Sequence, residues 1–205
     1  MGTRSKQSER CARCRMHEQL CICRAIPRYE LATRLVLVMH RREVSKLTAT
    51  GPLALEVLAN SELRIHGHQD RPLDFSDLDI PERRTLLLYP GDDVPVLSGD
   101  LLAEDPRPVT LVVPDGNWRQ AARMGKRLPG LNHATMVRLP EGRQTEWGIR
   151  HEHHAEGLAT FEAIARALGI IESPTVQSGM EELFRLMVQR TRQARGCQAQ
   201  QALNT

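Results

Sequence analysis

Four of the five cysteines in this chain of 205 residues lie close together near the N-terminus. They are spaced as Cys11-x2-Cys14-x6-Cys21-x-Cys23, which offers two pairs of thiolates to one ion. Four sulfurs at tetrahedral geometry are typical of a structural zinc site, so we predict that these cysteines bind zinc. An iron–sulfur cluster and reduced thiols without metal are the alternatives, whereas disulfides are disfavoured because no export signal is present. The fifth cysteine, Cys197, is interpreted as a passive thiol.

A second candidate site lies in the stretch VVPDGNWRQAARM, residues 112–124. An acid, Asp115, follows an apolar run that is typical of a buried strand, and Asn117 is a good helix N-cap. Ligands of α/β proteins bind at the carboxyl ends of the strands, so Asp115 is a candidate functional carboxylate. The alternative is that Asp115 only caps the helix and that Trp118 only fills core.

The helix expected over residues 117–127 has one cationic face, because its basic residues recur at helical spacing. These residues are Arg119, Arg123, Lys126 and Arg127. The middle of the chain, residues 51–110, carries 5 basic against 12 acidic residues, whereas both flanks are basic. Such a split can turn a positive face toward a polyanion such as nucleic acid, and an ordinary solvated surface is the alternative.

The elements that must position these residues alternate between strands and helices. Short apolar runs predict strands at 31–40, 85–89, 109–114 and 134–139. Apolar residues at helical spacing predict helices at 52–60, 117–127, 156–168 and 180–195. The alternation predicts an α/β fold around a mostly parallel sheet, and the 40% hydrophobic content fits one domain with appendages. The chain has no apolar run of membrane-spanning length and no signal peptide, so we expect a cytoplasmic protein.

Familiar cofactor motifs are absent from the sequence. The sequence has no P-loop, and no G-x-G-x-x-G motif follows a predicted strand. A nucleotide-like cofactor would therefore have to bind through a different kind of loop. The segment HEHHAEG, residues 151–157, has Ala155 where a zinc protease needs its second histidine.

The segment DGNW, residues 115–118, resembles the D-x-T-W signature of the DTW-domain family, the tRNA-uridine aminocarboxypropyltransferases. Four further motifs resemble those of the family in the same order: the cysteine motif, HRREVSKLTATG (40–51), LLLYPGDD (86–93) and ATFEAIARAL (159–168). The resemblance runs from about residue 10 to 190, nearly the whole chain. Asn117 stands where the family usually has Thr, and Ala49 where it usually has Asn.

The resemblance implies transfer of the 3-amino-3-carboxypropyl group of S-adenosylmethionine to N3 of a uridine in tRNA, with methylthioadenosine as by-product. Asp115 would be catalytic, either as the acceptor of the uridine N3 proton or as the group that holds the amino group of the transferred chain. Trp118 would also be catalytic, either by supporting the loop or by stacking on a base. The residues implied to bind the cofactor are Thr50, Gly51, Tyr89, Pro90, Gly91, Asp115, Arg150, Thr160 and Glu162. Among them Arg150 is the candidate for the carboxylate of the methionine moiety, because a guanidinium can grip both oxygens.

The family is similar to the SPOUT-type knotted methyltransferases, so the resemblance implies a SPOUT-like knotted domain that binds S-adenosylmethionine. We expect a disordered N-terminus at 1–9, a four-cysteine zinc-binding motif at 10–28, a DTW catalytic domain at 29–195 and a flexible tail at 196–205. The zinc would be structural. tRNA is the expected partner, contacted by the cationic helix face, with no membrane and no obligate protein partner expected and the oligomeric state left open.

Two other functions remain compatible with the sequence. One keeps the cofactor but methylates RNA, or transfers the aminocarboxypropyl group to ribosomal RNA. The other is a zinc-bearing RNA-binding module without catalysis.

Overall fold

The chain folds around one five-stranded sheet with strand order β2-β1-β4-β3-β5. The computed structural model describes residues 10–68, 73–89, 91, 93–117, 120–121, 123–124, 128–147 and 157–203. The strands are β1 (Arg34–His40), β2 (Ser61–His66), β3 (Arg84–Leu88), β4 (Val109–Asp115) and β5 (Thr135–Val137). Every pair of neighbouring strands is parallel, which confirms the predicted α/β fold and parallel sheet.

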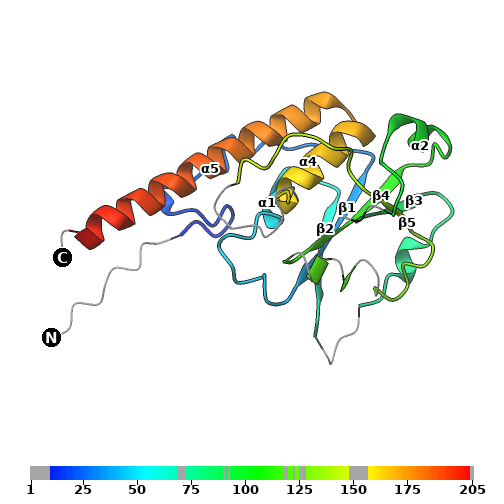
Figure 1. The fold of residues 1–205 in the computed structure, drawn as a ribbon, viewed down its shortest axis with the longest axis horizontal. Coiled ribbons are helices and arrows are strands. Elements are labelled where there is room, and N and C mark those ends of the chain that lie inside the picture. The colour runs from blue at the N-terminus through cyan, green and yellow to red at the C-terminus, as the bar shows by residue number, and fades with distance from the viewer. Residues whose placement is uncertain are drawn as a thin grey trace.

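Helices cover the sheet and connect its strands. Those with bounds inside the described residues are α1 (Pro52–Val57), α2 (Gly99–Ala103), α4 (Thr160–Ile171) and α5 (Pro174–Leu203), with short 3-10 helices at Glu18–Leu20, Cys23–Ala25 and Ser76–Leu78. Figure 1 shows α4 and α5 side by side, with α5 continuing well beyond the sheet. The N-terminal segment, drawn in blue, lies beside the distal half of α5. None of the helices in the described ranges combines the length and apolarity that a membrane span requires.

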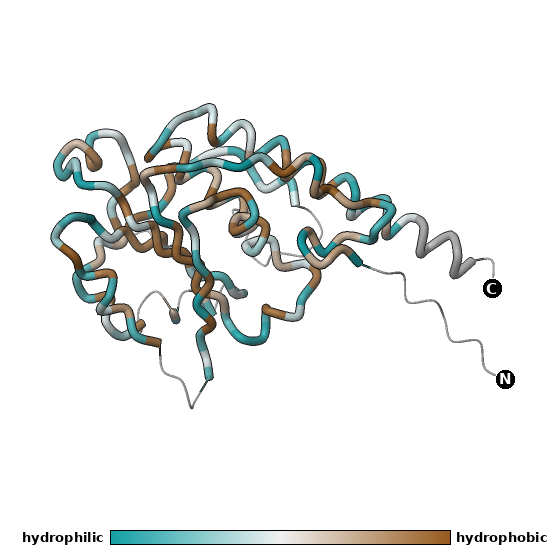
Figure 2. The backbone as a smooth tube through the Cα atoms, turned by 180° about the vertical axis from the view of Figure 1, so that it is seen from behind, coloured by the Kyte–Doolittle hydropathy of each residue, from teal (hydrophilic) through white to brown (hydrophobic). Residues whose placement is uncertain are grey.

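Both faces of the central strands β1, β3 and β4 are buried, and their residues are mainly apolar. Side chains alternate between the faces, so Leu35 and Leu37 of β1 belong to the core shared with α1, α4 and α5. Val36 and Val38 face a second, smaller core that contains Phe75. Figure 2 shows the apolar positions concentrated along the strands at the centre of the molecule.

The predicted strands are present, and so are the predicted helices as far as the structure describes them. Strand β2 was missed although its sequence, SELRIH, alternates polar and apolar residues as an edge strand does, because the segment is short and has only two apolar residues, Leu63 and Ile65. Helix α2, also missed, has only five residues, too few to show a period.

Helix α5 begins six residues before the predicted 180 and continues to Leu203, into the region predicted to be a tail. The dipeptide Ser173-Pro174 is a helix-start signal that identifies this beginning, since the Ser173 hydroxyl accepts a hydrogen bond from Val176 N at 3.4 Å.

Candidate active site and metal centre

The candidate active site lies at the carboxyl edge of the sheet. Asp115 is the last residue of β4, at the edge where the sequence predicted it. The parallel register places it beside Met39, one residue before the end of β1. Since β3 and β5 end at the same edge, the loops that follow four different strands lie at the edge that carries this carboxylate.

The Asp115 carboxylate is held by residues from two distant segments. It is only 4% exposed, and its Oδ1 accepts a hydrogen bond of 2.6 Å from the Thr160 hydroxyl at the start of α4. On its other side lies Gly51, where an added Cβ would stand 2.6 Å from Oδ2. The absence of a side chain at Gly51 is therefore what lets the carboxylate occupy this place.

The first turn of α4 is fixed from outside the helix. Its N-cap residue, Ala159, has no side-chain acceptor for the free N–H groups of the first turn. The buried Thr50 supplies one, because its Oγ1 accepts a hydrogen bond of 3.2 Å from Phe161 N. Thr50 and Gly51, implied as cofactor residues, thus position α4 and Asp115.

Glu162 anchors the segment 138–147 to α4. Its carboxylate is buried and accepts hydrogen bonds from Ala159 N at 3.1 Å and from Glu146 N at 2.9 Å. It also accepts a short hydrogen bond from the Thr145 hydroxyl. These contacts occupy both oxygens of Glu162, which turns toward the protein and is absent from the described wall of the cavity beside it.

That cavity has a volume of about 450 Å³ and lies at the carboxyl edge. Volumes of this size hold drug-sized ligands. Its wall includes Tyr89, Gly91, Gly116 and Thr160. Among the described residues, Asp115 itself is not part of the wall, so its carboxylate reaches the cavity through the hydroxyl of Thr160.

Two glycines shape the wall by close approach. An added Cβ at Gly91 would overlap the ring of Tyr89, so the aromatic ring lies over the backbone of that glycine. At Gly116 an added Cβ would come within 2.8 Å of Gln120 Cβ. Both glycines therefore permit contacts that no larger residue allows.

Asn117 caps the helix that follows β4, as predicted. Its Oδ1 accepts a hydrogen bond from Gln120 N at 2.9 Å, and Gln120 Oε1 accepts one from Asn117 N at 2.8 Å. This reciprocal pair is a capping box, which an asparagine forms as readily as a threonine. The position where the family usually has Thr thus retains a helix cap.

Gln120 also connects this turn to the end of β1. Its Nε2 lies 3.3 Å from His40 Nδ1, which accepts a second hydrogen bond from Arg42 N at 3.2 Å. Burial, with smaller contributions from His66 and Arg42, lowers the pKa of His40. His40 therefore favours the neutral form and serves as an acceptor at the edge of the site.

Several of the sequence-derived site residues lie outside the described ranges. These are Pro90, Trp118, Arg119, Lys126, Arg127 and Arg150. Arg123 is described and exposed. Three arginines of the cavity wall were not identified from the sequence, namely Arg138, Arg143 and Arg166. Arg138 directly follows β5, and a shorter predicted strand than 134–139 would have placed it at the same carboxyl edge as Asp115.

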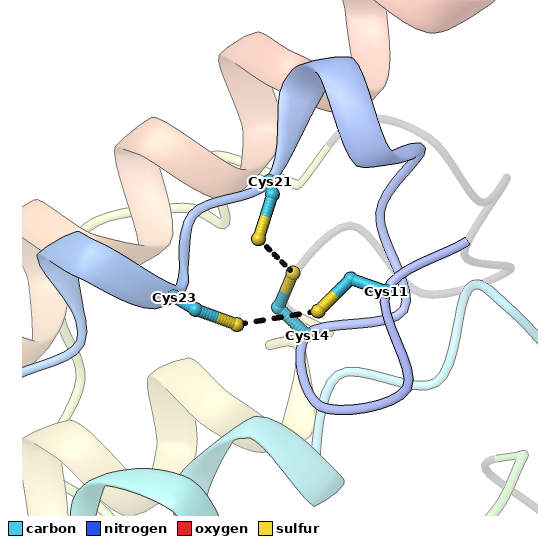
Figure 3. Close-up of side chains that lie close together, drawn as sticks. All are labelled: Cys11, Cys14, Cys21 and Cys23. Carbon is cyan, nitrogen blue, oxygen red and sulfur yellow. Dashed lines mark hydrogen bonds between the residues drawn. The ribbon is translucent and has the colours of Figure 1, made fainter. Parts of the chain in front are cut away.

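The four N-terminal cysteines form a cluster that can hold a metal ion. Figure 3 shows the side chains converging from Cys11, Cys14, Cys21 and Cys23. All four sulfurs lie within 4.8 Å of one another, with Sγ–Sγ distances of 3.4 Å for Cys11 and Cys23 and 3.7 Å for Cys14 and Cys21. Tetrahedral coordination with bonds of about 2.3 Å separates sulfurs by roughly 3.8 Å. None of the four forms a disulfide in the described structure.

The electrostatics of the cluster favour release of the first thiol proton at Cys11. Hydrogen bonds from the backbone N–H groups of Cys14 and Arg13 lower the pKa of Cys11 to about 6. Burial raises the pKa of Cys23 to about 12 and also raises that of Cys14. A thiolate held among protonated thiols is a group that a soft cation can bind while displacing the remaining protons.

The cysteine cluster packs against α5 rather than against the cavity. The Thr191 hydroxyl lies 3.9 Å from the sulfur of Met16, and Met16, Cys11 and Cys23 pack on the core that includes Met187. No cysteine belongs to the described wall of the cavity. The two candidate sites are therefore separate.

Comparison with known proteins identifies similar sequences along most of the chain. Residues 8–192 match the family described as the DTW domain. A tRNA-uridine aminocarboxypropyltransferase 2 of Macaca fascicularis is 27% identical over 174 residues, covering 82% of this chain and 58% of the relative. Its namesakes of Mus musculus and Drosophila melanogaster are 26% and 30% identical, covering 79% and 80% of this chain and 56% and 67% of the relatives. The chain thus spans less than three fifths of the two mammalian relatives, and no solved structure matches it.

Proposed function

This chain belongs to the DTW-domain family, and from that premise we propose that it is a tRNA-uridine aminocarboxypropyltransferase. The group transferred is the 3-amino-3-carboxypropyl group of S-adenosylmethionine, and the acceptor is N3 of a uridine in tRNA. One observation carries the proposal: Gly51, Asp115 and Thr160, from three separate family-like motifs, meet beside one cavity.

The cavity fits the proposed cofactor in size and in chemistry. Its volume of about 450 Å³ lies in the range of ligand pockets, and its wall combines an aromatic ring, Tyr89, with polar groups. When bound, S-adenosylmethionine supplies an electrophilic methylene carbon next to its sulfonium, and departure of the thioether leaves methylthioadenosine. Pro90, Gly91 and Arg150 belong to the same proposed cofactor site.

In the proposed reaction, the uridine exchanges its N3–H bond for an N3–C bond, so the protein must take up one proton. Asp115 is the proposed acceptor, and Thr160 is its contact with the cavity. The Thr160 oxygen accepts the uridine proton while its own hydroxyl proton passes to the carboxylate, which balances the transfer. In the second role considered for Asp115, the same pair would hold the amino group of the transferred chain. Trp118 is proposed to stack on a base.

We propose a structural zinc ion in the cysteine cluster of the segment 10–28. The support is the donor set of four thiols at separations near those of a tetrahedral site. Bound there, the metal would fix the N-terminal segment against α5. The segment 29–195 is the proposed catalytic domain, between the terminal segments 1–9 and 196–205.

The distal half of α5 supports contact with RNA. Residues 183–203 carry four arginines and no acidic residue. Arg185 and Arg192 are exposed and line a groove of about 550 Å³ that α5 forms with Thr145 and Glu146. Phosphate contacts by arginine supply most of the affinity for a nucleic-acid backbone. We propose that tRNA is contacted both by this groove and by the cationic helix face of Arg119, Arg123, Lys126 and Arg127.

The remaining proposals concern the chain as a whole. A SPOUT-like knotted arrangement is proposed from the family resemblance, and the all-parallel sheet is compatible with it. A cytoplasmic location, where tRNA is available, and the absence of an obligate protein partner complete the proposal.

The decisive experiment is incubation of the protein with S-adenosylmethionine and unmodified tRNA, followed by nucleoside mass spectrometry. We expect aminocarboxypropyl-uridine and methylthioadenosine, and loss of both products in Asp115→Ala and Thr160→Val. A methylated nucleoside would instead establish a methyltransferase. Modification of ribosomal RNA alone would change the substrate. Unchanged RNA binding and unchanged cellular phenotype in Asp115→Ala, with no product from the wild type, would establish a non-catalytic RNA-binding module.

The RNA surface is tested separately by charge reversal. Arg185→Glu combined with Arg192→Glu is expected to weaken tRNA binding and to reduce the slope of log affinity against log salt by about 2. The control is Arg107→Glu, because Arg107 precedes β4 and lies at the opposite edge of the sheet. Equal effects of the reversal and the control would remove the groove from the tRNA surface.

A further inference from the structure

The backbone of Arg138 is fixed at the cavity, while its guanidinium Nε has no partner among the described residues. It follows the last residue of β5 and lines the cavity. Its backbone is fixed on both sides, since Arg138 N donates to Pro95 O at 2.9 Å and Leu97 N donates to Arg138 O at 2.8 Å. Its Nε is buried and forms no hydrogen bond to any of the described residues.

Two other arginines of the sheet region, Arg83 and Arg84, satisfy their guanidinium groups with backbone carbonyls and, at Arg83, also with the Thr110 hydroxyl. Nη1 of Arg84 donates to carbonyl oxygens that include Leu101 O at 3.2 Å and Asp105 O at 2.7 Å. Arg83 donates to Ala32 O at 2.7 Å and to Val109 O. A buried guanidinium N–H without an acceptor is costly, so the exception at Arg138 requires an explanation.

Position distinguishes Arg138 from the other unsatisfied nitrogens. His133 Nε2 and Arg190 Nε are also buried without a partner among the described residues, but neither residue lines the cavity or the α5 groove. Arg138 lines the cavity together with Arg143 and Arg166. Against these three arginines, the described wall contains one carboxylate, that of Glu141, so an anion is favoured there.

We propose that Arg138 is the anion-binding residue of the cavity and grips an oxyanion of the ligand through Nε and a terminal nitrogen. Guanidinium groups bind carboxylates and phosphates in this two-pronged manner. The inference rests on the proposed function for the identity of the ligand, which offers two such oxyanions: the α-carboxylate of S-adenosylmethionine and a phosphate of tRNA. The carboxylate belongs to the group that is transferred, so Arg138 would hold that group in place and determine which carbon faces the acceptor.

Nuclear magnetic resonance provides a test that does not depend on activity. The Nε–Hε resonance of Arg138 is assigned by its disappearance in Arg138→Met, and the wild-type protein is titrated with three probes. These are S-adenosylmethionine, its decarboxylated analogue and inorganic phosphate. We expect the resonance to move with the first and third probes and to stay in place with the second. If S-adenosylmethionine moves other cavity resonances but not this one, and phosphate also leaves it unmoved, the inference is overturned.

Binding measurements then identify the source of the oxyanion. If it is the carboxylate, Arg138→Met lowers the affinity for S-adenosylmethionine about 10- to 100-fold and leaves that for the decarboxylated analogue within about threefold. If it is a phosphate, tRNA affinity falls and its salt slope drops by about 1, whereas cofactor affinity is unchanged. Arg107→Met is the control, because Arg107 is exposed, precedes β4 at the opposite edge of the sheet and is not part of the described cavity wall; it is expected to change either affinity less than about threefold.

The same experiments separate this inference from the proposed function. A wild-type protein that binds neither S-adenosylmethionine nor tRNA, but whose Arg138 resonance moves with phosphate, would refute the function and support the anion site. Normal binding of both ligands by a folded Arg138→Met protein would refute the anion site and leave the function standing. Should Arg138→Met not fold, Arg138→Lys is the second variant. It keeps the positive charge but cannot bind a carboxylate through two nitrogens, so it is expected to lose most of the preference for S-adenosylmethionine over its decarboxylated analogue.

Discussion

The contact between Gly51 and Asp115 predicts that one added methyl group disrupts the candidate active site. An Ala Cβ at this position would lie 2.6 Å from Asp115 Oδ2, 3.1 Å from its Cγ and 3.2 Å from Leu37 Cδ1. The backbone of Gly51 has φ −51° and ψ −44°, in the helical region that alanine adopts without strain. Any loss of stability in Gly51→Ala is therefore steric and does not come from the backbone.

The size of the effect follows from how little the neighbours can move. The Asp115 carboxylate is buried and fixed by the Thr160 hydroxyl, so it cannot swing into solvent at low cost. Inserting a methyl group into such a site typically costs about 1–3 kcal/mol. For a chain of this length, that loss corresponds to a decrease in Tm of roughly 2–12 °C. Because the carboxylate must shift, we also expect the affinity for S-adenosylmethionine to fall.

The assay is thermal and urea denaturation of Gly51→Ala beside a control, Gly99→Ala. An added Cβ at Gly99 meets no atom within 4 Å, so the control should keep its stability or gain up to about 1 kcal/mol. Combining Gly51→Ala with Asp115→Ala removes the overlapping carboxylate. The penalty of Gly51→Ala should then shrink by about 1 kcal/mol or more, as a coupling energy between touching residues. Additive effects of the two substitutions would refute the steric reasoning.

Three further predictions concern the metal site, the anchor of α4 and the edge of the sheet. Elemental analysis should find about one zinc per chain, lost in Cys11→Ser and Cys14→Ser and retained in Cys197→Ser; a folded protein without metal would contradict the site. Glu162→Gln leaves three donors with a single acceptor oxygen and should lower the free energy of unfolding in urea by about 1–3 kcal/mol, whereas a neutral result would deny the anchor. Burial lowers the pKa of His40, so the unfolded chain binds more protons below about pH 6.5, and stability should fall as the pH drops from there toward the folded pKa. His40→Gln should show a shallower fall over that interval, and an unchanged pH profile would exclude His40 as its source.

The sequence predicted those parts of the fold that depend on local patterns. The residues before Asp115 are mainly apolar, so residue type alone predicts a strand there and places its carboxyl end at Asp115. The same holds for the cap at Asn117, whose partner Gln120 lies three residues away. Edge strand β2 was not predicted, because a short strand with two apolar residues is stabilised mainly by its pairing with β1.

The parts that could not be predicted depend on approach between distant segments. Nothing in the residues around Gly51 indicates that its missing side chain makes room for an acid 64 positions away. Arg138 is one of 28 basic residues, and only the three-dimensional arrangement shows that its Nε is buried beside a cavity without an acceptor among the described residues. Such contacts are set by tertiary packing, which has no period along the chain.

One helical turn assembles the site. Residues 160–162, the start of α4, make contacts with three loops at the carboxyl edge: the Thr160 hydroxyl with Asp115, Phe161 N with Thr50, and the Glu162 carboxylate with residues 145–146. None of these contacts uses the side chain of residue 49 or 117, the two positions where the chain departs from the usual family pattern. The capping box of Asn117 also keeps the turn after β4 in place. These departures therefore leave the described contacts of this turn intact.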